Sequence, residues 1–368
     1  MLKNPEPRER ESVWERIRDC GKPVVLYGMG NGADKILAVM EKYGVLPADF
    51  FASDGFVRGH AFHGKTVLSL AQIREKYSDP LIVIAFASAL PEVMANMDAL
   101  DGEFEVVAPD VPVAGDTLFT RGYFEEHRAE FEEAYALLAD EESRRIFQAL
   151  IEYKISGKLS YLHSAESDPD AVLRELVHPE TVRCYADFGA YTGDTIRALL
   201  EHAENLETVY AMEPDARTFR KLSAYAAEEE RARINVFPYA AWDKHETLVF
   251  RSEGNRNSAP VQNGTAGIGV RQAKEKTVIT ERPDALLAGE TVDFIKYDVE
   301  GSEREALLGT RETIARCTPR LLVSIYHRTE DLFALPLLLH SMEPRYRFYL
   351  RRFPYIPAWD INLYCIPE

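Results

Sequence analysis

The sequence contains few cysteines, and none of them lie close together in the chain. The four are Cys20, Cys184, Cys317 and Cys365, and no Cys-x-x-Cys pair occurs. Structural zinc sites and disulfide frameworks are built from closely spaced cysteines, so the sequence predicts neither. Isolated thiols are typical of a reducing compartment, which predicts a cytoplasmic location.

An excess of basic residues is also lacking. The chain carries 43 Lys and Arg against 60 Asp and Glu, a formal net charge of -17 at pH 7. A charge of that sign repels a phosphate backbone and an anionic membrane surface. We therefore expect no nucleic-acid partner and no membrane partner, although the stretch 345–352 is locally basic.

Long hydrophobic runs are absent as well. The longest apolar run, residues 81–90, is too short to span a bilayer. The first residues are charged and lack the apolar core of a signal peptide. We therefore expect neither a membrane span nor a secretion signal.

What the sequence does contain is strands that alternate with helices, in two separate units. Its 368 residues, 46% of them hydrophobic, exceed what one core usually organises, so two domains are expected. In the first unit, four apolar runs alternate with helical stretches, which predicts a small parallel sheet. These runs are 23–27, 49–53, 81–87 and 104–108.

The second unit follows a helical stretch from Tyr123 to about Ile155, which we interpret as connecting helices; a homo-oligomer surface is the alternative use. Five more apolar runs then alternate with helices, and two final runs predict an antiparallel hairpin at the sheet edge. The seven runs are 182–188, 208–212, 235–238, 292–297, 321–325, 346–350 and 361–365. The predicted division is an N-terminal domain over 1–115, a helical connector over 116–170 and a second α/β domain over 171–368.

A glycine-rich turn follows the first strand of each unit. In a doubly wound sheet, such turns let a ligand approach backbone amides at the strand ends. The second turn, Asp187-Phe-Gly-Ala-Tyr-Thr-Gly193, is followed by Glu213 at the end of the next strand, where an acid accepts hydrogen bonds from ribose hydroxyls. Together with Asp298 at another strand end, this predicts a site for a nucleoside with an amino-acid tail, such as S-adenosylmethionine.

The first turn, Gly28-x-Gly30-x-x-Ala33, fits a dinucleotide fingerprint, and Asp54 lies about 20 residues further on, where a ribose-binding acid is expected. Two interpretations stay open. The turn either binds a dinucleotide or a sugar nucleotide, or its glycines serve packing alone in a domain that binds nothing.

At the second turn and beyond it, over about residues 185–365, the chain resembles the FkbM family of S-adenosylmethionine-dependent methyltransferases. The I-K-x-D-x-E-G-x-E run over 295–303 is the most specific part of the resemblance. The other matching runs are Asp187-Phe-Gly-Ala-Tyr-Thr-Gly-Asp194, Ala211-Met-Glu-Pro-Asp215, Ala240-Ala-Trp-Asp243 and Ser324-Ile-Tyr-His-Arg-Thr-Glu-Asp331. The N-terminal part resembles the small Rossmann-like domains of sugar-modifying enzymes and of some FkbM-type proteins.

The resemblance implies a seven-stranded Rossmann-like sheet over 171–368, with the smaller Rossmann-like domain joined to it by helices. It implies methyl transfer to an oxygen of a small-molecule acceptor, such as a sugar or glycan. The implied cofactor-binding residues are Asp187, Gly189, Tyr191, Gly193, Asp194, Glu213, Ala241 and Asp298. Many relatives carry a histidine where this chain has Arg352, so no role of that histidine is carried over.

Methyl transfer requires an aligned acceptor and a base that takes its proton. Adjacent parallel strand ends are expected to bring Asp298 and Glu300 near His327, and Lys296 shares a strand face with Asp298. We therefore predict a catalytic set of Asp298, Lys296, His327 and Glu300. Asp298 is favoured as the base, because Glu300 follows it by two residues and is expected nearer to solvent.

Several alternatives remain open. Glu300 can be a helix N-terminal acid and His327 a loop histidine bound to backbone. Asp298, Glu300 and His327 could together hold a divalent metal ion, but their spacing does not demand one and no metal is predicted. The polar stretch 252–269 is either a substrate-covering loop or an unstructured insertion. The competing functions are a nicotinamide-dependent oxidoreductase acting on a nucleotide sugar and a non-catalytic scaffold.

Overall fold

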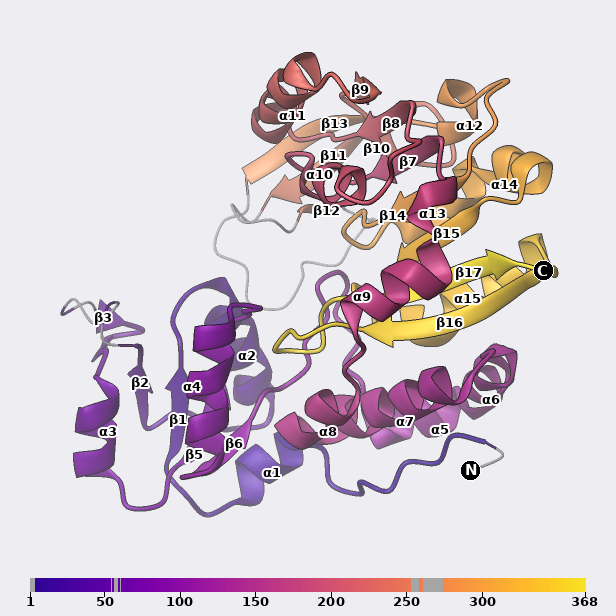
Figure 1. Ribbon diagram of the computed structural model, residues 1–368. Helices are drawn as coiled ribbons and strands as arrows, with labels where there is room; N and C mark the ends of the chain where they lie inside the picture. The colour runs from indigo at the N-terminus through magenta and orange to yellow at the C-terminus, as the bar shows by residue number, and fades with distance from the viewer. Residues whose placement is uncertain (1–3, 54, 56–58, 60, 253–257, 261–273) are drawn as a thin grey trace.

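The protein consists of two mainly parallel sheets and a layer of helices (Figure 1). The structure is a computed structural model that describes residues 4–53, 55, 59, 61–252, 258–260 and 274–368. Most of the polar stretch 252–269, predicted to be a loop, lies outside the described residues.

The first sheet is small and parallel, with the strand order β2-β1-β5-β6. All residues of β1 and β5 are buried, as expected for strands covered on both faces. The strands are β1 (Val24–Tyr27), β2 (Asp49–Phe51), β5 (Leu81–Ile84) and β6 (Glu105–Val107). The helices of this part are α1 (Val13–Asp19), α2 (Asn31–Lys42), α3 (Leu70–Lys76) and α4 (Pro91–Asp101), with a short hairpin of β3 (Ala61–Phe62) and β4 (Lys65–Thr66). The predicted N-terminal parallel sheet is confirmed.

A layer of helices follows, and in Figure 1 it lies beneath the C-terminal hairpin. It comprises α5 (Arg121–Glu126), α6 (Arg128–Leu137), α7 (Glu141–Ser156) and α8 (Leu159–Ser164). The N-cap of α7 is Asp140, which also accepts a hydrogen bond of 2.5 Å from Arg351 of the hairpin. Because Arg351 and Arg352 are both buried, this half of the basic stretch 345–352 faces inward.

The second sheet has seven strands in the order β16-β17-β15-β14-β7-β8-β9, and α9 (Pro169–Val172) leads into it. Its strands are β7 (Cys184–Phe188), β8 (Thr208–Met212), β9 (Arg233–Phe237), β14 (Phe294–Tyr297), β15 (Arg320–Ser324), β16 (Tyr346–Arg352) and β17 (Ile361–Pro367). Only β17 runs antiparallel to its neighbours, β15 and β16, so the predicted edge hairpin is confirmed. The helices are α10 (Asp194–Leu200), α11 (Ala216–Glu228), α12 (Pro283–Leu286), α13 (Glu303–Gly309), α14 (Arg311–Cys317) and α15 (Asp331–Met342).

Two features differ from the sequence-based expectation. The helical stretch that the sequence pattern predicts over 302–315 is two helices, α13 and α14, which meet at Thr310. Gly309 lies against the Trp242 carbonyl there, and Thr310 donates its hydroxyl to the Ala306 carbonyl. A further small sheet, not predicted, has the order β10-β13-β11-β12. Its strands are β10 (Ala240–Ala241), β11 (Glu246–Ser252), β12 (Ser258–Pro260) and β13 (Lys274–Glu281).

The two large sheets are joined by specific contacts as well as by the helices. Ser88, after β5, and Ile356, between β16 and β17, exchange two backbone hydrogen bonds of 2.9 and 3.0 Å. Ala114 donates its N–H to the carbonyl of His327 at 2.9 Å. One continuous hydrophobic cluster also runs from the first sheet through the helices into the second. The division predicted near residues 115 and 170 stays a prediction.

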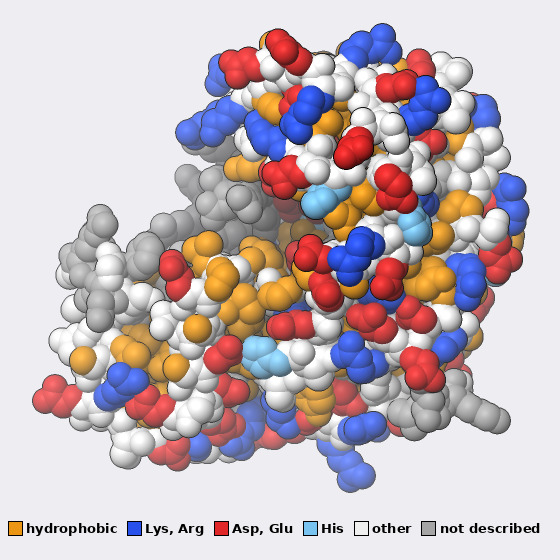
Figure 2. All heavy atoms as spheres, in the orientation of Figure 1, with side chains coloured by type: hydrophobic (Ala, Val, Ile, Leu, Met, Phe, Trp, Pro, Cys, Tyr) orange, Lys and Arg blue, Asp and Glu red, His pale blue; other side chains and the backbone are white. Residues whose placement is uncertain are grey.

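The surface shows no separation of charge on the face drawn in Figure 2, where acidic and basic side chains intermingle. Across the described residues, no helix combines the length and the apolar character needed to cross a bilayer.

A buried ion pair joins the end of the first sheet to the helical layer. Lys154 of α7 and Asp110 lie 2.6 Å apart, with only 3% and 7% of their side chains exposed. We expect Lys154→Met to lower the free energy of unfolding by about 3–5 kcal/mol, because Asp110 is left as a buried charge without its counter-ion. Thermal or urea denaturation would measure the loss.

The double variant Lys154→Met, Asp110→Leu removes both charges and is expected to recover most of that stability. Arg18→Met, which breaks an exposed pair with Asp19, is the matched control and should leave the midpoint unchanged. A single variant as stable as the wild type would contradict the assignment.

Candidate functional site

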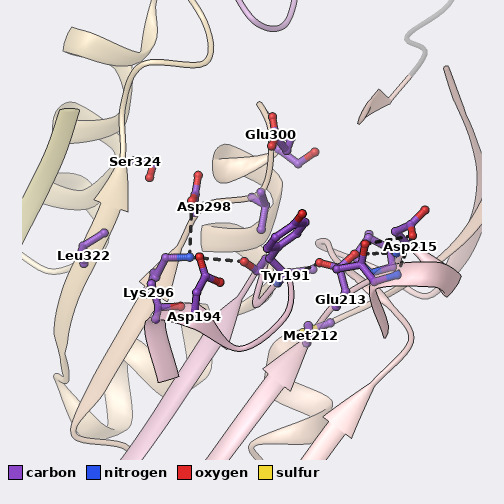
Figure 3. Close-up of a pocket in the computed structure, with 18 of the residues that line it drawn as sticks. Tyr191, Asp194, Met212, Glu213, Asp215, Lys296, Asp298, Glu300, Leu322 and Ser324 are labelled. Carbon is purple, nitrogen blue, oxygen red and sulfur yellow. Dashed lines mark hydrogen bonds and ion pairs between the residues drawn. The ribbon is translucent and has the colours of Figure 1, made fainter. Parts of the chain in front are cut away.

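A cavity of about 910 Å³ opens at the carboxyl ends of the strands of the second sheet (Figure 3). Its size suits a ligand of nucleoside dimensions. Eight of the predicted site residues line it: Gly189, Tyr191, Asp194, Glu213, Ala241, Lys296, Asp298 and Glu300. The other three, Asp187, Gly193 and His327, are not part of its lining and lie behind the wall.

The glycine turn after β7 sits directly against the turn after β14. Gly189 has φ +83°, and a Cβ atom there would lie 1.9 Å from the Asp298 carbonyl oxygen. The missing side chain therefore allows the two turns to meet and form one wall of the cavity. Gly193 has a supporting role, because a Cβ there would meet the ring of Tyr225 at 2.6 Å.

Glu213 links the turns at the ends of β7 and β8. Its buried carboxylate accepts the N–H of Tyr191 at 3.0 Å and that of Asp215 at 2.7 Å (Figure 3). Asp215 itself caps α11 by accepting two backbone N–H groups at 2.9 Å. Glu213 is thus held at the strand end where an acid can meet a ribose.

Lys296 lies between two carboxylates at the cavity floor. Its Nζ is 3.3 Å from Asp187 Oδ1 and 3.5 Å from Asp298 Oδ2. Burial opposes the charge of Lys296, but the two carboxylates outweigh it and hold the pKa above its ordinary value. Asp187 is fully buried and also accepts from the Thr195 hydroxyl at 2.6 Å, so it positions Lys296 and does not face the cavity.

Asp298 and Glu300 differ in their proton affinity. Burial alone would raise the pKa of Asp298, but Lys296 and His327 bring it below its ordinary value. The pKa of Glu300 is raised to about 7, first by burial and then by the charges of Asp298, Glu303 and Glu213, against the lowering effect of His327. At neutral pH, Asp298 is ionised and Glu300 exchanges its proton readily.

The expectation that Glu300 lies nearer to solvent than Asp298 was wrong. Their side chains are 29% and 33% exposed. The reason is the backbone at Glu300, where φ is +56°. This left-handed conformation turns the chain before α13 begins, so Glu300 lies over the cavity near Asp298 (Figure 3). The acid in the first turn of the helix is Glu303 instead.

His327 is buried among carboxylates. Its Nδ1 lies 2.9 Å from Glu303 Oε1, and its Nε2 lies 3.6 Å from Asp298 Oδ1 and 3.7 Å from Glu300 Oε2. Burial disfavours the charged ring, but Glu303 and the other acids raise its pKa to about 10. The predicted proximity of Asp298, Glu300 and His327 is confirmed, and the ring is an imidazolium at neutral pH. Within the described chain, no group of three His, Cys, Asp or Glu side chains is arranged to hold a metal ion.

The opposite wall of the cavity is aromatic, and sequence analysis missed it. Tyr355 and Trp359, in the turn between β16 and β17, have ring centroids 5.6 Å apart, and the Trp359 ring stacks on Tyr326 at 6.3 Å. Tyr326 also donates its hydroxyl to Asp298 at 3.2 Å. The signal available was the density of aromatic residues in the turn between the two last strands.

Arg352 braces this aromatic turn from behind. It is fully buried and donates to the Leu162 carbonyl at 2.9 Å and to the Tyr355 carbonyl. The residue that departs from the family pattern therefore connects α8 to the aromatic wall.

The first glycine turn has a packing role. A Cβ at Gly28 would lie 2.7 Å from the Phe86 ring, and one at Gly32 would lie 2.6 Å from the Ala85 carbonyl. At both positions the absent side chain lets the turn pack directly against the loop after β5. Asp54, the predicted ribose-binding acid, lies outside the described residues, so binding of a dinucleotide there stays a hypothesis.

Comparison with known proteins agrees with this architecture. Residues 187–355 match the model of the methyltransferase FkbM domain. A crystal structure of methyltransferase FkbM from Methylobacillus flagellatus KT is similar over 99% of this chain and 94% of that one, with a TM-score of 0.68 and 20% sequence identity. The predicted fold class is therefore confirmed.

A more distant likeness is Aeropyrum pernix fibrillarin in complex with natively bound S-adenosyl-L-methionine. It covers 50% of this chain and 66% of that one, with a TM-score of 0.32 and 13% identity. No curated protein matches the chain.

The raised pKa of Glu300 makes stability depend on pH. The folded protein retains a proton that the unfolded chain releases near pH 4.5, so the stabilisation is complete below that pH and is lost as the pH rises through about 7. Glu300→Gln cannot ionise, and we expect its thermal midpoint to exceed that of the wild type at pH 8 by more than at pH 5. Differential scanning calorimetry at both pH values would measure this.

The matched control is Glu207→Gln, which removes an exposed acid paired with Arg183. It should show the same small difference from the wild type at both pH values. A Glu300→Gln difference that does not change with pH would contradict the raised pKa.

Proposed function

We propose that the protein is an S-adenosylmethionine-dependent O-methyltransferase that acts on a small hydroxyl-bearing acceptor such as a sugar. The premise is that residues 187–355 match the model of the methyltransferase FkbM domain. The observation that carries the proposal is a single cavity with a strand-end acid, Glu213, on one side and the Asp298–Glu300 pair on the other. Bound S-adenosylmethionine would supply the methyl group.

The cofactor half of the cavity fits a nucleoside with an amino-acid tail. Glu213 is fixed by two backbone N–H groups and can accept hydrogen bonds from ribose hydroxyls. The absent side chain at Gly189 lets the turns after β7 and β14 meet, and Gly189 itself lines the cavity. The lining of the cavity on the same side also includes Tyr191, Asp194 and Ala241.

The acceptor half offers the two kinds of surface that a sugar needs. Tyr326, Tyr355 and Trp359 present apolar ring faces, and Glu300 and Asp360 present oxygens that accept from hydroxyl groups. A cyclic sugar has an apolar ring face and a hydroxyl edge, so it satisfies both.

Glu300 is the proposed proton acceptor. A pKa of about 7 places it where a general base works best at neutral pH. Asp298, favoured from the sequence, has a lowered pKa and is the weaker base, while the His327 imidazolium carries its proton already. Asp298, held ionised by Lys296, supplies negative charge to the same end of the cavity.

Cofactor binding is tested with S-adenosylhomocysteine by calorimetry. We expect the wild type to bind and Glu213→Ala to lose roughly 10-fold to 100-fold in affinity, because a charged acceptor of hydrogen bonds is removed. Glu213→Gln keeps an acceptor oxygen and should lose less, and Glu207→Ala, an exposed acid, should bind as the wild type.

Failure of the wild type to bind at millimolar ligand would end the proposal. A dinucleotide released from the purified protein, detected by mass spectrometry, would favour the oxidoreductase instead.

The identity of the general base is tested by measuring turnover. The assay uses a methyl-labelled cofactor and a panel of sugars and other hydroxyl compounds as candidate methyl acceptors. We expect Glu300→Gln to lower kcat by about 100-fold or more with little change in S-adenosylhomocysteine affinity, because general-base loss commonly costs that much. Asp298→Asn should lower kcat less and move the acid limb of the pH profile to lower pH, because the charge of Asp298 raises the pKa of Glu300. If Asp298→Asn abolished turnover and Glu300→Gln retained it, Asp298 would be the base.

A further inference from the structure

His327 joins the two cavity carboxylates to a deeper acid. Its ring is fully buried, and its Nε2 lies at almost equal distances, 3.6 and 3.7 Å, from Asp298 and Glu300. Two carboxylates that both lie this close to one ring nitrogen repel each other, and the positive charge of the ring offsets that repulsion. The position of this ring therefore matters to both acids.

The carboxylate behind the ring belongs to Glu303, the first residue of α13. One oxygen, Oε1, lies 2.9 Å from His327 Nδ1 and accepts the N–H of Val299 at 2.9 Å. Val299 directly precedes Glu300. The same oxygen therefore forms an ion pair with the imidazole and a hydrogen bond with the turn that carries the proposed base, and only 1% of Glu303 is exposed.

We propose that Glu303 is a positioning residue for methyl transfer: it fixes the His327 ring with Nε2 between Asp298 and Glu300 and anchors the turn on which Glu300 stands. The inference rests on the proposed role of Glu300 as proton acceptor. It assigns Glu303 no contact with cofactor or acceptor, because Glu303 is not part of the cavity lining.

The surroundings of the ring identify Glu303 as its counter-ion. Glu303 faces Nδ1 from α13, and Asp298 and Glu300 face Nε2 from the turn after β14. Asp331 also acts on the ring from α15, but burial and the neighbouring Glu303 raise its pKa well above the ordinary value, which favours its uncharged form. The Tyr326 ring lies 4.0 Å away between centroids, and burial raises the pKa of its hydroxyl, so it stays neutral too.

Arg328, the next residue in the chain, does not compete for this role. Its Nε donates to the Gly301 carbonyl at 2.7 Å, and its backbone N–H donates to Asp331 at 2.8 Å. Glu303 is therefore the charged partner of the imidazolium on its inner side, and removing that charge acts on the ring first.

The variant Glu303→Gln tests the inference, because glutamine keeps the size and an acceptor oxygen but removes the charge. We expect ¹⁵N NMR of the imidazole to show that His327 loses its proton at a pH lower by about 1 unit or more than in the wild type. Because the charge of Glu303 also raises the pKa of Glu300, its removal should move the acid limb of the kcat profile to lower pH, and displacement of the turn that carries Glu300 should lower kcat by roughly 10-fold. Affinity for S-adenosylhomocysteine and KM for the acceptor should change less than about 2-fold.

Two further variants serve as controls. Glu303→Asp keeps the charge, so His327 should lose its proton at the same pH as in the wild type, which preserves a test if glutamine impairs folding. Glu305→Gln, on the same helix and near Arg328 and Arg304, should leave both the NMR titration and the pH profile as in the wild type.

The outcomes separate this inference from the proposed function. Unchanged titration of His327 in Glu303→Gln, with a folded protein, would overturn the role of Glu303. A shifted titration with an unmoved acid limb would overturn the link to Glu300 as base, while S-adenosylhomocysteine binding would still stand. A shift of both supports the inference, and the NMR titration needs no turnover to be read.

Discussion

The site depends on one buried cation, Lys296, between two carboxylates. Lys296 pairs with Asp187 across the parallel strands β14 and β7, so their side chains share one face of the sheet. Asp298, two residues further along the chain, emerges on that same face. An unpaired lysine at this depth would be costly, and the two acids make its burial tolerable. Strand register therefore places Asp298 at the cavity floor, where Lys296 keeps it ionised.

Acids outnumber cations around the cavity, and because of this imbalance the acids differ from one another in pKa. Asp298, Glu300 and Glu303 all lie against His327, and Asp298 also lies against Lys296. The two cations lower the pKa of Asp298, whereas burial and Glu303 raise that of Asp331. Glu300 lies between these extremes. A proton acceptor tuned near neutrality thus arises from the count of charges and their distances, without any special residue type.

The sequence predicted the features that periodicity and topology determine. The common face of Lys296 and Asp298, the approach of His327 and the edge hairpin are all consequences of strand register. The features that it could not predict depend on contacts between distant segments. The left-handed backbone at Glu300 changes the depth of that side chain, and two-residue spacing carries no information about it. The aromatic wall depends on the turn between β16 and β17, whose place is set by Arg352 and by Ser88, far away in the chain.

The contacts of that turn explain why the N-terminal sheet belongs to the site even without a ligand of its own. Ser88 holds Ile356 through two backbone hydrogen bonds, and Ile356 follows Tyr355 of the aromatic wall. Val113 lines the cavity, and Ala114 bonds to the carbonyl of His327. Without these contacts, the turn between β16 and β17 would sample many positions, and ordering it when an acceptor binds would cost conformational entropy. Because the first sheet anchors the turn before an acceptor arrives, that cost is met on folding and the acceptor wall is preorganised.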